Sequence, residues 1–372
     1  MSKLNDLIKE LCPDGVEYKK LGSFTKILRG KRLTKNLLSD EYEFCVYHGG
    51  LEPLGKFKNY NRNENTVMII NVGASAGTIG FCKEKFWSSD GCFCVENNDS
   101  FSSRYLYYYL SNNENYFQSK VRKAGIPTLD ASVVENYIIP LPPLPVQCEI
   151  VRILDNFTAL TSALTAELTA QRKRYSGFLN SLLSFEGRDA QDGVLWKKLG
   201  DAVGIKRGVR VVKAQLNEVG EYPVYQNSLT ALGNYNYFNC NANKTFLITA
   251  GAAGEIGYSY VPFWAADDCY YFECNDSGLM ERYLYYALKT RQYKLKRMVR
   301  NASVPRLGRY SIENLLIPVP SLEEQQRIVD ILDRFDKLCN DLSEGLPAEI
   351  AARQKQYEYY RDKLLTFKEK EA

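Results

Sequence analysis

The sequence contains a single histidine, His48, and its ten cysteines are scattered along the chain without one Cys-x-x-Cys pair. A zinc site needs clustered thiolates or Cys/His pairs at fixed spacing, so we expect no metal site. The cysteines are expected to be reduced and to pack as small hydrophobic residues. One histidine also leaves little scope for general-base catalysis.

Long apolar runs are missing too. No run reaches the roughly 20 residues that a transmembrane helix needs, and the first residues, Met1 to Asp6, lack the pattern of a signal peptide. We therefore expect a cytoplasmic protein that makes no membrane contact. The 372 residues suffice for two domains of ordinary size, each with its own core.

Catalytic signatures are also lacking. Residues 50–57 fit a phosphate-binding loop up to the last position, where Phe57 replaces the Ser or Thr that would hold magnesium. The glycine-rich residues 73–80 lack the G-x-G-x-x-G spacing of a dinucleotide loop. The Asp/Asn-Pro-Pro-Tyr/Phe signature of an adenine N6-methyltransferase is absent, because Pro-Pro occurs only at residues 142–143. We therefore expect no catalytic residue.

An internal repeat is the most prominent feature that the chain does have. Asp14 to Gly22 recurs 178 residues later as Asp192 to Gly200, with seven of the nine residues identical. Further matches at the same offset join residues 104–108 to 282–286, 126–127 to 304–305, and 150–155 to 328–333. Residues 42–65 and 222–243 share little beyond richness in aromatic residues and asparagine. The chain thus carries two copies of one scaffold with two different surfaces.

A repeat of this length indicates a duplicated domain rather than a solenoid, whose units span roughly 20–50 residues. Two like domains commonly pack about a pseudo-two-fold axis, as the subunits of homodimers do. Such a protein suits a partner that is itself nearly two-fold, and duplex DNA is one. The alternative is a duplication that serves stability alone.

Each copy is expected to be an α+β domain. Short β-rich segments such as Thr66 to Ile70 and Thr245 to Thr249 are separated by Gly and Asn turns. Helices are predicted for residues 102–111 and 280–290, with tyrosines on one face that favour core packing over base stacking.

A heptad pattern follows each copy and predicts a coiled coil. Ser321 to Glu324 forms a capping-box signature at the start of the second helix, and Gly345 and Pro347 are expected to break that helix near residues 345–347. Two such helices most simply pair antiparallel within the chain; the alternative is a coiled coil between chains. The predicted seam consists of Ile150, Leu154, Phe157, Leu164, Leu168, Ile328, Leu332, Phe335, Tyr357 and Leu364.

Basic residues gather locally although the net charge is only +4. Residues 289–309 contain eight Lys or Arg and no acid, and Arg29-Gly30 and Arg207-Gly208 coincide in the repeat. Such clusters are expected at phosphate contacts, although each taken alone is more often a solvated face. The predicted DNA contacts are Arg29, Lys31, Arg32, Arg122, Lys123, Arg207, Arg210, Arg297, Arg300 and Arg306. Residues 59–62 and 234–237, rich in Asn and Tyr, are second candidates.

These features together resemble a known family. The repeated D-G-V-x-x-K-K-L-G start, the proline-rich residues 139–145 and 317–320, and the Q-x-x-I-V-x-I-L-D-x-F helix starts are similar to the specificity subunit of a type I restriction–modification system. The resemblance covers the chain from about Cys12 to Phe367. Residues 324–328, Glu-Gln-Gln-Arg-Ile, are particularly typical, whereas the first copy has Val-Gln-Cys-Glu-Ile at residues 146–150.

The resemblance implies a non-enzymatic subunit with an α+β fold, in which two pseudo-two-fold-related target-recognition domains are separated by an antiparallel coiled coil. The domains would span residues 1–143 and 186–320, and the spacer helices residues 144–185 and 321–372. Each domain would recognise one half of a bipartite, asymmetric site in double-stranded DNA.

The implied partners are two methyltransferase (M) subunits, which methylate adenine N6, and restriction (R) subunits. No cofactor is expected on this chain; S-adenosylmethionine, ATP and Mg are expected on the partner subunits. The residues leave two alternatives: a standalone DNA methyltransferase, which the missing signatures oppose, and a coiled-coil scaffold that binds no DNA, which the basic clusters oppose.

Overall fold

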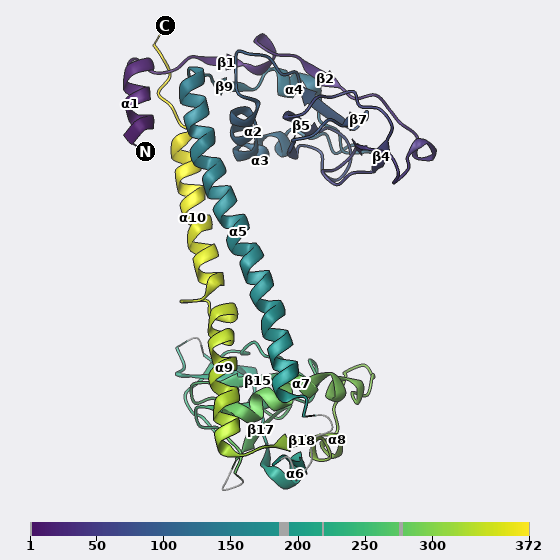
Figure 1. The fold of residues 1–372 in the computed structure, drawn as a ribbon, viewed down its shortest axis with the longest axis vertical. Helices are drawn as coiled ribbons and strands as arrows, with labels where there is room; N and C mark the ends of the chain where they lie inside the picture. Colours follow the sequence, from purple (N-terminus) through teal and green to yellow (C-terminus); the bar gives the residue numbers. More distant parts are fainter. Residues whose placement is uncertain (1, 186–192, 218, 275–277, 372) are drawn as a thin grey trace. The chain divides into compact units, whose positions relative to one another are not determined.

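The computed structural model describes residues 2–185, 193–217, 219–274 and 278–371 (Figure 1). The chain divides into two compact units: Met1–Leu164 with Ile350–Ala372, and Thr165–Glu349. Each unit is considered on its own. Asp192, the first residue of the second repeat, and the predicted domain start at residue 186 lie outside the described residues. The predicted domain boundaries and the two-fold relation of the copies stay predictions.

The first unit contains three small sheets. Strand β1 (Tyr18–Lys20) pairs antiparallel with β9 (Ile138–Pro140). An antiparallel sheet has the order β2 (Ile27–Arg29), β8 (Cys92–Val95), β5 (Thr66–Ile70) and β6 (Ile79–Cys82). A third sheet has the order β4 (Gly55–Phe57), β3 (Phe44–Tyr47) and β7 (Trp87–Ser88), in which β3 and β7 run parallel.

Strand β5 shows why the four-stranded sheet forms at this place. All five of its residues are buried, so both faces of the strand are covered. Val67 and Ile69 belong to one hydrophobic cluster, whereas Met68 and Ile70 belong to another that includes buried cysteines. Alternate residues of a strand point to opposite faces, so this short apolar run joins two cores. All ten cysteines are free and seven are buried, as predicted.

Helix α2 packs against strands β5 and β6 of this sheet, and shorter helices flank it in the sequence. Helix α1 (Ser2–Leu11) precedes the first strand. Helix α2 (Ser103–Asn112) begins after Ser102, whose hydroxyl accepts the Tyr105 N–H and so caps the helix. Tyr105 and Tyr108 are buried, which confirms their predicted packing role. The remaining helices of this part are α3 (Glu114–Ser119) and α4 (Ala131–Glu135).

The second unit repeats the same sheets strand for strand. Strand β10 (Leu195–Lys198) pairs with β18 (Leu316–Val319). The four-stranded sheet has the order β11 (Gly204–Arg207), β17 (Cys269–Glu273), β14 (Lys244–Ile248) and β15 (Ile256–Ser259). The three-stranded sheet has the order β13 (Asn234–Tyr235), β12 (Tyr222–Tyr225) and β16 (Trp264–Ala265). The duplication inferred from the sequence is therefore a duplication of topology.

The helices of the second copy differ from those of the first. Helix α7 (Glu281–Arg297) is continuous, whereas α2 and α3 of the first copy are separated at Asn113. Helix α6 (Leu199–Ala202) follows β10, and α8 (Arg309–Glu313) precedes β18. The predicted helix at residues 280–290 is thus confirmed but extends seven residues further, to Arg297.

Long helices complete both units: α5 (Leu144–Leu183), α9 (Leu322–Asn340) and α10 (Leu346–Leu364). In the first unit, Phe157 of α5 stacks on Tyr360 of α10 with ring centroids 5.6 Å apart, and Ile150 and Leu154 cluster with Leu364. In the second unit, the ring centroids of Phe178 on α5 and Phe335 on α9 are 5.1 Å apart. Numbers rise along α5 as they fall along its partner, so the pairing is antiparallel (Figure 1).

The predicted seam residues lie on the inner faces of these helices. Ile150, Leu154, Ile328 and Leu332 have no exposed surface, and Leu364 is 5 % exposed. The other predicted seam residues are partly buried: Phe157, Leu164, Leu168, Phe335 and Tyr357.

A turn separates α9 from α10. The Asp341 carboxylate accepts hydrogen bonds from the N–H and hydroxyl of Ser343, at 2.7 and 2.6 Å. A Cβ on Gly345 would lie 2.6 Å from the Lys337 carbonyl oxygen, so this turn requires glycine. Pro347 is the second residue of α10, where a missing N–H costs nothing. The interruption therefore begins at Asp341, before the proline.

Candidate nucleic-acid interface

Arg29 and Arg207 occupy the same place in the two copies. Each is the last residue of an edge strand, β2 or β11, and each is exposed. The glycine that follows is required, because a Cβ would lie 1.8 Å from the Ser89 carbonyl oxygen at Gly30 and 2.0 Å from the Ala266 carbonyl oxygen at Gly208. The glycine of the repeated Arg-Gly pair is thus required by the fold, whereas the arginine lies at the surface.

The segments after these glycines are fixed by tryptophans. The Trp87 indole N–H donates to the Lys31 carbonyl at 2.7 Å, and the Trp264 indole N–H donates to the Val209 carbonyl at the same distance. The predicted DNA contacts Lys31, Arg32 and Arg210 are exposed on or beside these fixed segments.

A short hairpin follows the helices in each copy, and we call the two loops the Arg122 hairpin (residues 122–128) and the Arg300 hairpin (residues 300–306). The end residues of each exchange two backbone hydrogen bonds of 2.9 and 3.1 Å. The N–H groups of Gly73 and Gly251 donate to Pro127 and Pro305 at 2.9 and 3.1 Å. The glycine-rich turns that resembled nucleotide loops thus hold these hairpins. Ile126 and Val304 remain exposed on them, at 71 % and 46 %.

The second copy has a pocket of about 430 Å³ beside its hairpin. It brings together three predicted DNA contacts, Arg207, Arg300 and Arg306, and adds Arg309. Two acidic residues, Asp267 and Asp268, line the same pocket. The Arg207 Nε–H donates to the Asp267 backbone carbonyl at 3.2 Å. Arg309 is paired with Glu313 at 2.6 Å, so Arg207, Arg300 and Arg306 against the two aspartates leave an excess of one positive charge, which suits a polyanion.

The first copy has a less basic surface at the same place. In the repeat register, Thr128 replaces Arg306 and Ala131 replaces Arg309. Arg122, the counterpart of Arg300, forms an ion pair with Asp130 at 3.0 Å. The same backbone therefore presents two different sets of groups.

The other predicted DNA contacts are placed separately. Lys123 lies on the Arg122 hairpin, and Arg297 is the last residue of α7. All ten predicted contacts are exposed, which contact with DNA requires. Which of them contact bases stays a prediction.

Part of the basic run at residues 289–309, which was predicted to contact phosphates, is not exposed. Arg291 is only 5 % exposed, lies 5.2 Å from the centre of the Trp196 ring, and donates to the Leu183 carbonyl. Burial lowers the pKa of Lys289, and Lys296 pairs with Glu255 at 2.5 Å. Helical periodicity turns some residues of a basic run inward, so part of this run stabilises the domain.

The second-candidate loop at residues 59–62 has a clear structural role. The Asn61 side chain donates to the Ser88 carbonyl and accepts the Ser88 N–H, at 3.0 and 2.7 Å. Arg62 donates to the Arg29 carbonyl at 2.7 Å. Of the other loop, residues 234–237, Asn234 and Tyr235 form strand β13.

Two further residues at this site were not predicted, His48 and Gln226. His48 Nδ1 lies 3.3 Å from Asp90 Oδ1, and Gln226 Nε2 donates to Asp267 Oδ1 at the same distance. The available signal was the repeat itself, since Val-Tyr precedes both residues at an offset of 178. His48 had been considered only as a metal ligand or general base. No group of three or more His, Cys, Asp or Glu that could hold a metal ion occurs among the described residues.

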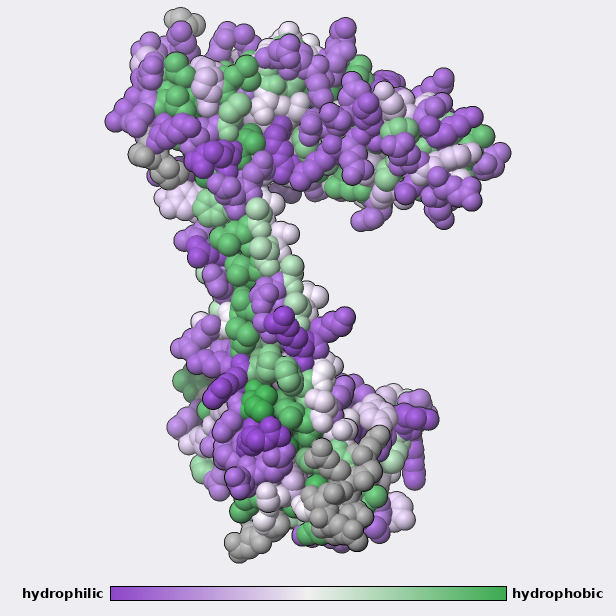
Figure 2. All heavy atoms as spheres, in the orientation of Figure 1, coloured by the Kyte–Doolittle hydropathy of each residue, from purple (hydrophilic) through white to green (hydrophobic). Residues whose placement is uncertain are grey.

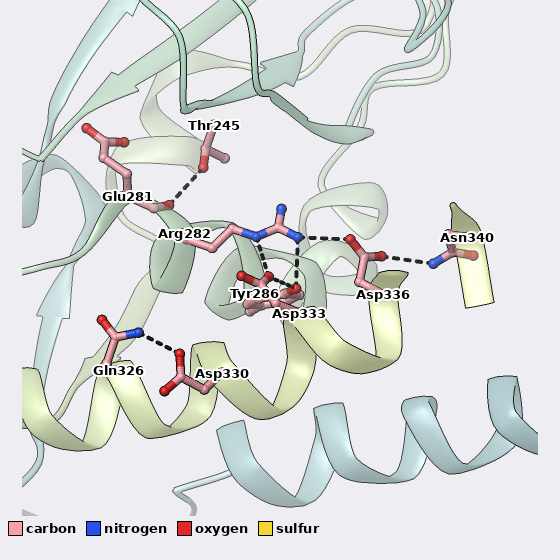
Figure 3. A network of polar contacts seen from close by, with 9 residues as sticks. All are labelled: Thr245, Glu281, Arg282, Tyr286, Gln326, Asp330, Asp333, Asp336 and Asn340. Atoms are coloured by element: carbon pink, nitrogen blue, oxygen red, sulfur yellow. Dashed lines mark hydrogen bonds and ion pairs between the residues drawn. The ribbon is translucent and has the colours of Figure 1, made fainter. Parts of the chain in front are cut away.

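The repeated sequences far from the hairpins join each domain to its long helix. Arg282, in the first turn of α7, donates to Asp333 at 2.6 Å and to Asp336 at 2.9 Å on α9 (Figure 3). The Tyr286 hydroxyl donates to the same Asp333 oxygen at 2.5 Å. In the first copy, Arg104 and Tyr108 contact Asp155 in the same way, with Thr158 in place of Asp336. The repeated Arg-Tyr-Leu-Tyr-Tyr and Ile-Leu-Asp sequences are therefore contact partners.

Helices of sufficient length and apolarity to cross a bilayer do not occur among the described residues.

Comparison with known proteins identifies the scaffold. The family model described as "Type I restriction modification DNA specificity domain" matches residues 13–173 and again 193–352. The specificity subunit of the Escherichia coli type I restriction enzyme EcoR124I/EcoR124II is 32% identical, with 99% of this chain and 98% of that protein covered. A putative type I restriction enzyme specificity subunit from Haemophilus influenzae is 28% identical over 95% of this chain and 96% of its own length.

A solved structure has the same fold. The crystal structure of a type I restriction–modification S subunit from M. genitalium superposes with a TM-score of 0.72 at 19% sequence identity, covering 94% of this chain and 96% of that one. With two matches that together cover most of the sequence, the chain belongs to the family of type I restriction–modification DNA specificity proteins.

Proposed function

We propose that each copy recognises one half of a bipartite, asymmetric sequence in double-stranded DNA. The observation that carries this proposal is the difference between the copies at equivalent positions. Where the second copy has the exposed residues Arg306 and Arg309, the first has the partly exposed Thr128 and Ala131, on matching hairpins and short helices. A scaffold that served stability alone would gain nothing from such a difference at its surface.

We further propose that the coiled coil sets the distance between the half-sites and binds two methyltransferase subunits, which methylate adenine N6. Apolar residues exposed on the helices, and on the turn between α9 and α10, support a docking role: Leu160 at 41%, Phe178 at 43% and Tyr359 at 61% on the helices, and Leu342 at 84% on the turn. Figure 2 shows such apolar side chains at the surface of the helical segments. Large exposed apolar groups commonly mark protein contacts. One structural neighbour, which aligns with a TM-score of 0.57, comes from a study whose title names the complex assembly and conformational transition of the type I R-M system.

The remaining parts of the proposal concern partners and place. S-adenosylmethionine, ATP and Mg would be bound by the methyltransferase and restriction subunits, and the protein would act in the cytoplasm on the DNA of its cell. This chain would contribute recognition to the methylation and cleavage that its partners perform.

Mapping of N6-methyladenine by single-molecule sequencing tests the proposal. Genomes from cells with and without this gene are compared, in a strain whose methyltransferase subunit is expressed. We expect one bipartite motif to lose methylation when the gene is deleted, and a plasmid copy to restore it. An unchanged map would contradict the recognition role.

A further inference from the structure

His48 and Gln226 are placed identically by the backbone. Each is the first residue after a strand, β3 or β12, that runs parallel to β7 or β16. The carbonyl of the preceding tyrosine accepts an N–H from the neighbouring turn at 2.9 Å, from Ser89 in the first copy and from Ala266 in the second. The two side chains therefore begin at equivalent points of the interface.

An aspartate lies beside one end of each side chain. Asp90 lies 3.3 Å from His48 Nδ1, and Asp267 accepts from Gln226 Nε2 at the same distance. The Gly91 N–H also donates to His48 Nδ1, at 3.2 Å. A ring that accepts at Nδ1 carries its proton on Nε2, so Nε2 of His48 is a hydrogen-bond donor.

The other end of each side chain is available. Within the described parts of the chain, no group hydrogen-bonds to His48 Nε2 or to Gln226 Oε1, and both residues are partly exposed. Asp267, which holds Gln226, lines the arginine pocket of the second copy together with Arg207 and Arg300. Gln226 therefore hydrogen-bonds to a residue of the pocket that contains Arg207 and Arg300.

We propose that His48 and Gln226 are equivalent specificity-determining residues, each forming hydrogen bonds with the edge of one base in the half-site of its own domain. This inference rests on the proposed function. Gln226 has Oε1 and one amide hydrogen left, the acceptor and donor that pair with N6 and N7 of adenine in the major groove. His48 has a single donor left, which suits an acceptor such as guanine N7 or O6. Asp267 is a positioning residue for the Gln226 contact, and the Gly91 N–H orients the ring of His48.

The test exchanges the two residues in the full chain, assembled with its methyltransferase subunits: His48→Gln in one variant and Gln226→His in another. The methylated motif is read by single-molecule sequencing of DNA from cells that carry each variant. We expect each exchange to change base preference about tenfold or more at one position of one half-site, and to leave the other half-site unchanged.

Gln326→His is the matched control, because Gln326 is also exposed and donates to an aspartate, Asp330, at 2.7 Å, but on α9 away from the hairpins. This variant should keep the wild-type motif. Asp267→Asn leaves the base-contacting amide of Gln226 in place and weakens its anchor, so it should relax preference at the same position that Gln226→His alters.

The outcomes separate this inference from the proposed function. If the wild-type complex methylates a bipartite motif and both exchange variants keep every base preference, the roles of His48 and Gln226 are refuted while the recognition role stands. If the wild-type complex methylates no bipartite motif, the proposed function itself fails. A fall in methylation at all sites, with unchanged preference, would assign the two residues to stability and would also refute the inference.

Discussion

Single residues account for much of what the repeat preserves. Gln147 and Gln325, which occupy equivalent positions near the starts of α5 and α9, are both buried. Gly30 and Gly208, which follow Arg29 and Arg207, lie where a Cβ atom has no room. These residues stand out in the sequence because they are identical in the two copies, but the sequence does not show which groups they contact. Arg291 was grouped with surface residues, because composition does not show which side of a helix faces the core.

Glu149 is a residue whose charge the fold uses. Its side chain is 3% exposed and pairs with Arg152 at 2.6 Å and with Lys3 of α1 at 3.3 Å. The hydrogen bonds from Arg152 lower the pKa of Glu149 to about 2, against the opposing effect of burial. A lowered pKa in the folded state means that these pairs stabilise fully above the ordinary pKa of 4.5 and lose their effect as the pH falls toward 2.

Glu149→Gln is therefore expected to lower the free energy of unfolding at pH 7 by on the order of 1 kcal/mol, a modest value because Arg152 is largely exposed. The difference from the wild type should shrink as the pH falls below 4.5. Urea unfolding between pH 3 and pH 7 measures it, with exposed Glu10 changed to Gln as the control. A difference independent of pH would contradict the ionic explanation.

Elements were predicted best where their residues alone determine them. Strand β5 matches its predicted range, and α2 is displaced by one residue, because a run of four apolar residues after Thr66 and a serine cap are local signals. Strands β7 and β16, of two residues each, form because the parallel strands β3 and β12 lie beside them. No local pattern contains that information. The hairpins of the interface depend likewise on distant glycine turns.

The junction between α7 and α9 depends on Gln325, which has no exposed surface. Its amide donates to the carbonyls of Pro320 and Gly278 at 2.9 and 2.8 Å and accepts the Met280 N–H at 2.9 Å. Gln325→Ala removes three hydrogen bonds and leaves the buried Pro320 carbonyl without this partner, so we expect a loss of about 3 kcal/mol in unfolding free energy. Gln326→Ala, on the exposed side of the same turn, should cost less than about 0.5 kcal/mol. Equal effects in a denaturant titration would show that the buried bonds do not hold the junction.

At the scale of the whole molecule, the chain is a recognition subunit that contains two versions of one domain, and it is not a catalytic subunit. Its identity followed from the sequence, because the repeat and the helix starts are shared by both copies. The residues of the recognition surface could not be predicted from the repeat, because they are the residues in which the two copies differ. Arg306 and Thr128, at the same position of the two hairpins, illustrate this. A change on one hairpin should consequently affect one half-site alone.

Arg300→Ala tests that independence, with Arg122→Ala as its counterpart in the first copy. If Arg300 contacts only phosphate, binding weakens equally on all sequences, and the slope of log K against log salt falls in magnitude by about 0.9. If Arg300 contacts a base, discrimination is lost at one base pair of the second half-site, by about 1–3 kcal/mol. Titrations of the assembled methyltransferase complex at several salt concentrations, on DNA altered in either half-site, distinguish the two. In both cases preference within the first half-site should be unchanged, and a change there would mean that the two domains do not recognise DNA independently.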